Sequence, residues 1–189
     1  MDTFIVQGGK SLNGEIIPQG AKNEALQVIC ASLLTQEKVT INNLPDISDV
    51  NNIIELMSSM GVRVTRESES TASFEAREIN IDYLQTKEFR TQSVSLRGSI
   101  MVVGPLLARF GKAYIQKPGG DRIGRRRVDT HLIGFRKLGA RLEFDHADPF
   151  FKIEADRLKG TYIHLDEASV TGTANIIMAA ILAEGRTTI

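Results

Sequence analysis

Pro105-Leu-Leu-Ala-Arg-Phe-Gly-Lys-Ala-Tyr-Ile115 occurs in three related versions along the chain. The other two begin 74 residues before it and 74 residues after it, and they read Ala31-Ser-Leu-Leu-Thr-Gln-Glu-Lys-Val-Thr-Ile41 and Ala179-Ala-Ile-Leu-Ala-Glu-Gly-Arg-Thr-Thr-Ile189. Each version predicts the end of an apolar helix, a tight turn with Lys or Arg, and a strand. Units repeated at such a period bury their helices by stacking against one another. The sequence therefore predicts a fold built from repeats.

A second part of the unit is repeated as well. Apolar residues at helical spacing run from Val50 to Met60 and again from Val128 to Leu138, and glycines follow at 61 and 139. This pattern predicts a helix that ends at a C′ glycine. The offset is now 78, so the second unit has four extra residues between its first strand and its second helix. Further strands are predicted at 61–64, 73–76, 139–142, 151–155 and 162–165.

The two ends of the chain fit the repeat less well. Residues 1–20 predict short strands at Phe4–Val6 and Gly14–Ile17, but they have no partner unit in the sequence. The third copy stops at Ile189, before its second half. We expect an α/β (α+β) domain over residues 21–189, with three repeats of about 74 residues and the third truncated.

Composition excludes several classes of protein. Lys plus Arg and Asp plus Glu number 23 each, so no global positive field would attract nucleic acid or an acidic membrane. The longest apolar run, 100–108, is too short to span a bilayer, and no signal-peptide pattern is present. One cysteine and three scattered histidines give no disulfide framework and no metal-ligand spacing. The expectation is a cytoplasmic protein without a metal.

The four extra residues of the second unit fall in a strongly charged loop. Lys117-Pro-Gly-Gly-Asp-Arg-Ile-Gly-Arg-Arg-Arg-Val-Asp129 contains four arginines, three glycines and two carboxylates. Glycines allow close backbone approach, and Arg side chains bind phosphate and carboxylate oxygens. The loop is therefore suited to a multiply charged anion, with Asp121 as a group that handles a proton. Alternatively, Asp121 is a turn residue or the partner of a neighbouring Arg, and Asp129 caps the helix that follows.

The predicted helix starts carry a second group of candidate residues. Lys22 and Asn23 open the first repeat helix, where free N–H groups favour an anion. Arg97 and the segment 169–173 fall at the equivalent starts in units two and three. The three starts could face one cleft; alternatively, Lys22 is merely solvated and Asn23 is a cap. Cys30, inside an apolar helix, is expected to be inert.

Short segments over nearly the whole chain match one known family. The matches are Phe4–Gly8, Gly20–Asn23, Arg97, Gly104–Gly111, Pro118–Gly120, Ile123–Gly124, Arg126, Val128–Asp129, His131, Ser169–Val170 and Leu182–Gly185. Together they resemble the enolpyruvyl transferases, and most closely the members that act on UDP-N-acetylglucosamine. The resemblance implies an inside-out α/β barrel of repeated βαβαββ units, truncated here within the third unit. It also implies that residues 1–20 pack into a second domain, missing from these 189 residues.

The resemblance also implies a reaction. The enolpyruvyl group of phosphoenolpyruvate moves to the 3-hydroxyl of UDP-N-acetylglucosamine, phosphate is released, and no cofactor takes part. By resemblance, Lys22 and Arg126 contact phosphoenolpyruvate and Asn23 lies next to the reacting hydroxyl. The residues placed near the nucleotide sugar are Arg97, Arg126, Arg127, Val128, Asp129, Thr130, Ser169, Val170 and Thr171.

The sequence departs from the family pattern in the charged loop. Asp121 stands where many members have the cysteine that fosfomycin alkylates, and Arg127 stands where proline is common. A carboxylic acid can donate a proton but is a poor partner for that epoxide, so we expect catalysis with little fosfomycin sensitivity. The family's second domain supplies a base and further arginines, so the 189 residues alone are expected to be inactive.

The sequence leaves three other functions open. The family also contains enzymes that use a phosphorylated shikimate, although Pro118–Asp121 and Arg126–Asp129 favour the nucleotide sugar. The chain could instead be a noncatalytic module that binds an anion or a nucleotide sugar. It could also be a repeat scaffold for protein partners.

Overall fold

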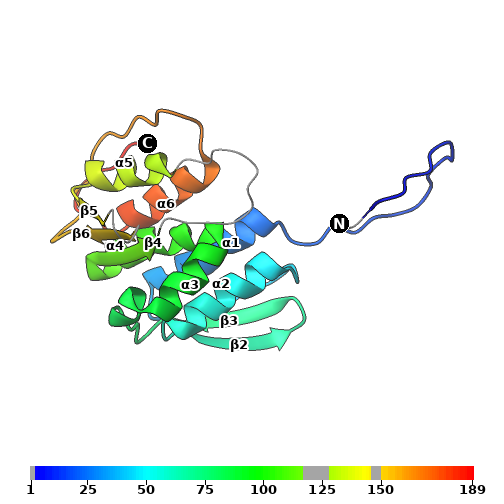
Figure 1. The fold of residues 1–189 in the computed structure, drawn as a ribbon, viewed down its shortest axis with the longest axis horizontal. Helices are drawn as coiled ribbons and strands as arrows, with labels where there is room; N and C mark the ends of the chain where they lie inside the picture. The colour runs from blue at the N-terminus through cyan, green and yellow to red at the C-terminus, as the bar shows by residue number, and fades with distance from the viewer. Residues whose placement is uncertain (1–2, 117–127, 146–149) are drawn as a thin grey trace.

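The computed structural model describes residues 3–116, 128–145 and 150–189 (Figure 1). The α-helices are α1 (Lys22–Ala31), α2 (Ser48–Ser59), α3 (Lys87–Ser95), α4 (Val103–Phe110), α5 (Asp129–Lys137) and α6 (Val170–Ala180). The 3-10 helices are η1 (Ser32–Leu34), η2 (Asp82–Gln85) and η3 (Arg97–Val102). The strands are β1 (Val39–Ile41), β2 (Arg63–Ser68), β3 (Thr71–Glu75), β4 (Lys112–Gln116), β5 (Arg141–Asp145) and β6 (Phe150–Glu154).

The sheets of the first two predicted units have the same strand order. The described strands form two three-stranded antiparallel sheets, with the order β1-β3-β2 in the first and β4-β6-β5 in the second. In both units the strand that follows the first helix pairs with the last strand, which lies in the middle of the sheet. An identical order in two segments of different sequence shows that units one and two have the same topology.

Glycines end the helices where the sequence predicts. Gly61 and Gly139 follow α2 and α5 with φ of 104° and 99°, and Gly111 caps α4 with φ of 67°. These left-handed conformations favour glycine because a Cβ atom is crowded there. Unit one has Glu37 at the place of Gly111, and there the chain leaves α1 through η1 instead.

The helices form the interior and the sheets lie outside them. In Figure 1 the sheet with β2 and β3 lies at the lower edge, β5 and β6 lie at the left, and the helices fill the space between. The shared core contains large side chains from both units, among them the fully buried Phe74, Phe89 and Phe135. Because neither unit has a core of its own, burial of these side chains stabilises both units together.

Two close helix contacts set the position of α6. A Cβ atom on Gly104 of α4 would lie 2.3 Å from the Asn175 side-chain oxygen, and one on Gly134 of α5 would lie 2.3 Å from Ile176. Both distances are shorter than real carbon contacts allow, so glycine is needed at both positions. The result is that α4 and α5 press directly against α6.

Arg109 joins the two units at the other end of α4. Its Nη1 atom donates hydrogen bonds to the carbonyl oxygens of Leu33, Thr35 and Ala76, at 2.9, 3.2 and 2.6 Å. All three carbonyls belong to unit one, at the end of η1 and just after β3. Burial lowers the pKa of the Arg109 guanidinium. The hydrogen bonds compensate for removing this charge from water.

The structure differs from the prediction at both ends of the chain. No strand forms in residues 3–20, which extend away from the body in Figure 1. The strands predicted at Phe4–Val6 and Gly14–Ile17 are therefore absent from this structure, and Phe4 is 93% exposed. A strand needs a hydrogen-bonding neighbour, and residues 3–20 have none here.

The segment expected to be the third unit contains α6 but no described strand. Isolated bridges join Lys159 to Glu184 and Tyr162 to Thr188. The described residues therefore form the mixed α/β fold that was predicted, but they close no barrel. The segment η2–α3 between the units was also not predicted, because its apolar residues are few and Phe89 is the largest that it buries.

Candidate functional site

Helix starts from the three units meet at one pocket. The pocket has a volume of about 140 Å³. Its lining includes Lys22 and Asn23 from α1, Arg97 from η3 and Thr171 from α6, together with Asp49 and His131. Four of the residues selected from the sequence are thus brought together. The cleft predicted from the three starts is present, although the unit-two start is a 3-10 helix rather than an α-helix.

The start of α1 is open to a ligand. Its N-cap residue is Ala21, and no side chain caps the helix, so Asn23 is not the cap that the alternative interpretation required. The Nζ atom of Lys22 lies 2.6 Å from a carboxylate oxygen of Asp49, at the start of α2. Both side chains are exposed, at 49% and 38%. An exposed pair of this kind adds little to stability, which leaves Lys22 available to another anion.

A buried network lies directly behind the pocket. Asn175 of α6 accepts a hydrogen bond from the Gly104 N–H at 2.9 Å and donates one to the Ile100 carbonyl at 2.8 Å. Its amide nitrogen is also 3.0 Å from Nδ1 of His131 on α5. One side chain therefore connects η3, α4, α5 and α6.

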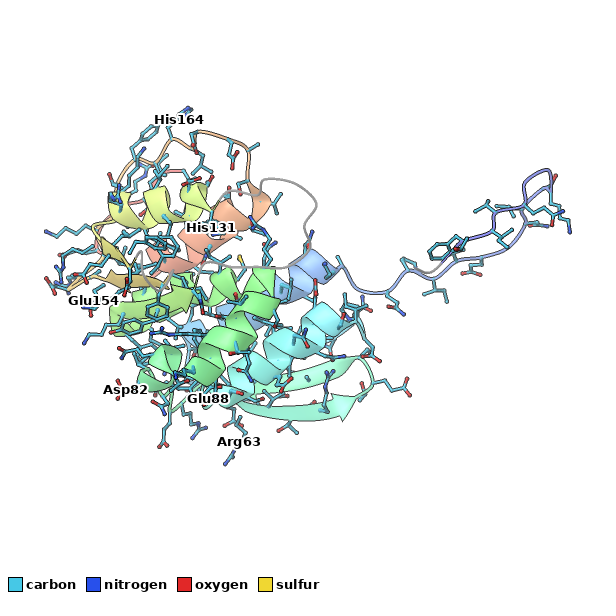
Figure 2. The ribbon with its side chains drawn as sticks, in the orientation of Figure 1. Arg63, Asp82, Glu88, His131, Glu154 and His164 are labelled. Carbon is cyan, nitrogen blue, oxygen red and sulfur yellow. The ribbon has the colours of Figure 1, made fainter. Side chains whose placement is uncertain are left out.

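His131 is a buried histidine at the centre of the helix cluster, whereas His164 lies at the outer edge of the molecule (Figure 2). Burial, and secondly the positive charge of Arg97, lower the pKa of His131 from 6.5 to about 4. Both causes disfavour the charged form of the ring. The pocket wall therefore contains a neutral imidazole at neutral pH, beside the cations Lys22 and Arg97 and the carboxylate Asp49.

The low pKa of His131 predicts loss of stability in acid. The unfolded chain binds the proton at pH values below about 6.5, whereas the folded protein resists it down to about 4. The free energy of unfolding is therefore unaffected by protonation of His131 above pH 6.5. It decreases as the pH falls to about 4, by roughly 3 kcal/mol in total. Urea unfolding at several pH values should show this slope in the wild type but not in His131→Asn. His164→Asn, which changes an exposed histidine, is the control and should keep the wild-type profile.

The starts of α5 and α6 lie against each other beside the pocket. Ser169 caps α6 by accepting a hydrogen bond from the Gly172 N–H at 3.1 Å. Thr130 contacts the same turn and donates to Glu167 at 3.2 Å. Ser169 and the 75% exposed Val170 line a separate, open groove rather than the pocket.

The other candidate residues named from the sequence either do not line the pocket or lie outside the described residues. Val128 is the N-cap residue of α5 and Asp129 is its first residue, so Asp129 does not cap that helix. Asp121, Arg126 and Arg127 lie outside the described residues. Cys30 is fully buried, and burial raises the pKa of its thiol, as expected for an inert core cysteine.

Among the ionisable residues of the pocket lining, the sequence analysis assigned no site role to Asp49 or to His131, although His131 is one of the positions that match the family. Asp49 lies 27 positions from Lys22, and no local pattern indicates that contact. His131 is three positions after the helix-capping Val128 and could have been selected as a polar residue on the inner face of α5. Its partner Asn175 is 44 positions away, so only the structure shows the network.

The described part of the chain offers few other chemical sites. Within it, no group of three or more His, Cys, Asp or Glu side chains is arranged to hold a metal ion. No helix there is long and apolar enough to cross a bilayer. The pocket instead combines two cations, one carboxylate and neutral hydrogen-bond donors, an arrangement that suits a negatively charged ligand.

The chain is similar in sequence to a known family of enzymes. A family profile described as EPSP synthase (3-phosphoshikimate 1-carboxyvinyltransferase) matches residues 6–189. Two curated relatives are named UDP-N-acetylglucosamine 1-carboxyvinyltransferase. The one from Bacteroides thetaiotaomicron is 59% identical and the one from Bacteroides fragilis is 57% identical, each over all 189 residues. The chain spans 44% of the length of each of these relatives.

A solved structure supports the fold. The enolpyruvyl transferase NikO from Streptomyces tendae superposes with a TM-score of 0.70 over 95% of this chain and 41% of its own. The sequence identity is 17%, so this similarity concerns the fold alone.

Proposed function

Because the chain belongs to the EPSP synthase family of enolpyruvyl transferases, we propose that it contributes the first half of a UDP-N-acetylglucosamine 1-carboxyvinyltransferase. The observation that carries the proposal is the meeting of Lys22, Arg97 and Thr171, from three separate units, in one cationic pocket. The choice of acceptor follows the names of the relatives that are 57–59% identical. The proposed reaction is the first committed step of peptidoglycan synthesis, carried out in the cytoplasm.

The proposed reaction joins phosphoenolpyruvate to the 3-hydroxyl of the nucleotide sugar. A proton is added to C3 of phosphoenolpyruvate, and the sugar oxygen bonds to C2 as its own proton leaves for a base. The tetrahedral intermediate then loses a proton from C3 and breaks its C2–O bond to phosphate. Positive charge near the phosphate and carboxylate stabilises the charge that develops during both steps.

The roles of the residues remain those implied by the family resemblance. Lys22 and Arg126 are proposed to bind phosphoenolpyruvate, and Asn23 is proposed to lie next to the reacting hydroxyl. The proposed contacts to the nucleotide sugar are Arg97, Arg126, Arg127, Val128, Asp129, Thr130, Ser169, Val170 and Thr171. Lys22 and Asn23 are exposed at the start of α1, which no side chain caps, and this supports their proposed roles in substrate binding.

Asp121 is proposed to donate the proton to C3, and this predicts a response to fosfomycin. A carboxylate is a weaker nucleophile than a thiolate toward an epoxide, so the wild-type protein should turn over in the presence of the drug. Asp121→Cys should acquire a covalent adduct and lose turnover. Phosphate release by the native full-length protein measures turnover, mass spectrometry after incubation with fosfomycin detects the adduct, and the drug-free wild type is the control. An adduct on Asp121 itself would contradict the prediction.

The proposed function is tested by phosphate release. The native protein is mixed with phosphoenolpyruvate and either UDP-N-acetylglucosamine or shikimate 3-phosphate. We expect release only with the nucleotide sugar; release only with shikimate 3-phosphate would assign the other activity of the family. Binding of UDP-N-acetylglucosamine without release in either mixture would identify a noncatalytic binding module.

The same assay determines what the 189 residues do alone. The relatives are more than twice as long, and the missing half of the cleft is proposed to supply the base that deprotonates the sugar. We therefore propose that a second domain is required as a partner. Turnover by the isolated 189-residue chain would refute that requirement.

A further inference from the structure

We propose that His131 is a ligand-binding residue of the pocket and that Asn175 is the residue that positions it. The Nε2–H group of His131 donates a hydrogen bond to a carboxylate or phosphoryl oxygen of the bound anion. Asn175 fixes the imidazole in the tautomer that can make this bond. The identity of the anion, phosphoenolpyruvate or the diphosphate of the nucleotide sugar, rests on the proposed function.

The backbone groups around Asn175 fix the orientation of its side-chain amide. The Gly104 N–H can only donate, so the atom that faces it at 2.9 Å is the side-chain oxygen of Asn175. The Ile100 carbonyl can only accept, so the atom that faces it at 2.8 Å is the amide nitrogen. Two backbone groups of known character thus fix both ends of the amide.

The orientation of the Asn175 amide in turn fixes the tautomer of His131. The amide nitrogen of Asn175 uses one hydrogen on the Ile100 carbonyl and directs the other toward Nδ1 of His131, 3.0 Å away. Nδ1 must therefore accept, and a neutral ring that accepts at Nδ1 has its proton on Nε2. The low pKa caused by burial and by Arg97 keeps the ring neutral.

The His131 ring is buried and also lines the pocket. Only 3% of His131 is exposed, yet the residue lines the pocket together with Lys22 and Arg97. A hydrogen bond from such a desolvated donor is stronger than one made in water. A neutral donor also avoids adding a third positive charge beside Arg97. The ring can thus recognise an anion at neutral pH without titrating.

Two substitutions separate binding by His131 from its structural contact. His131→Asn places an amide oxygen near the position of Nδ1, where it can still accept from Asn175, but it has no group at the position of Nε2. His131→Gln places an amide N–H near the position of Nε2 but loses the acceptor for Asn175. If His131 were purely structural, His131→Asn would be closer to wild type than His131→Gln in both stability and ligand affinity. If His131 binds the ligand, His131→Gln should keep the higher affinity.

The experiment uses the native protein at the full length at which it is made. The imidazole nitrogens are observed by 15N NMR, and dissociation constants are measured by calorimetry for phosphoenolpyruvate, UDP-N-acetylglucosamine and inorganic phosphate. We expect the Nε2–H tautomer in the wild type and a shift of the Nε2 resonance on binding. His131→Asn should keep the urea midpoint within a few per cent and bind the contacting anion at least 10-fold more weakly, as expected for a lost hydrogen bond to a charged group. His131→Gln should recover most of that affinity at a lower urea midpoint.

The outcomes distinguish this proposal from the proposed function. A proton on Nδ1, or unchanged affinity in His131→Asn with tight substrate binding in the wild type, would overturn the role of His131 alone. A wild type that shifts its Nε2 resonance with inorganic phosphate but binds neither substrate would overturn the proposed function and leave His131 as an anion-binding residue. The absence of any binding or shift with all three compounds would overturn both.

Discussion

Replacing Asn175 by Leu is expected to destabilise the protein by roughly 2–6 kcal/mol, although the two side chains have similar shapes. The change leaves the Gly104 N–H and His131 Nδ1 without their partner and removes one hydrogen bond from the Ile100 carbonyl. Each buried polar group that loses its partner costs about 1–3 kcal/mol. Equilibrium urea unfolding, followed by circular dichroism, measures the loss.

Asn52→Leu is the matched control for this prediction. Asn52 is on the exposed side of α2, so the same exchange there should change the free energy of unfolding by less than about 0.5 kcal/mol. A loss at Asn175 no greater than the loss at Asn52 would show that the buried network contributes little to stability.

Replacing Lys22 by Met is expected to reduce the rate of phosphate release by about 100- to 1000-fold. The substitution keeps an unbranched side chain of similar length but removes the positive charge at the open start of α1. The stability should hardly change, because the Lys22–Asp49 pair is exposed. Initial rates with phosphoenolpyruvate and UDP-N-acetylglucosamine give the activity, and the urea midpoint gives the stability.

Lys38→Met provides a close comparison. Lys38 forms an equally exposed pair with Glu67, at 2.8 Å, but it lies just before β1 and not in the pocket. Its replacement should leave the rate within about twofold of wild type. If both variants lost activity equally, the effect would come from net charge and not from the pocket.

The sequence predicted those features that depend on local patterns. The spacing of apolar residues predicted α2 and α5, and the glycines at 61 and 139 predicted where those helices end. The repeat indicated that the helix starts at 22–23, 97 and 169–173 could face one cleft, because equivalent positions in stacked units face the same side, and residues from all three starts line the pocket. These predictions needed only the order of residues along the chain.

Contacts between distant residues could not be predicted in the same way. The pairing of Asn175 with His131 and that of Lys22 with Asp49 depend on how the helices approach each other. The strands expected in residues 1–20 had the right composition, but a strand forms only when a neighbouring strand is available. The roles assigned to Asp121, Arg126 and Arg127 remain predictions, since they lie outside the described residues.

Arg109 gives the fold a cooperative character. Three carbonyl oxygens of unit one accept hydrogen bonds from Arg109 of unit two. Neither unit can therefore unfold without breaking these hydrogen bonds to the other. Simple repeat arrays lose their ends one unit at a time, because each unit contacts its neighbour over a limited surface. Here the slowest amide protons of α1 and α4 should exchange with the same free energy of opening, through one shared opening event. A ligand bound among the helix starts would then slow exchange throughout both units.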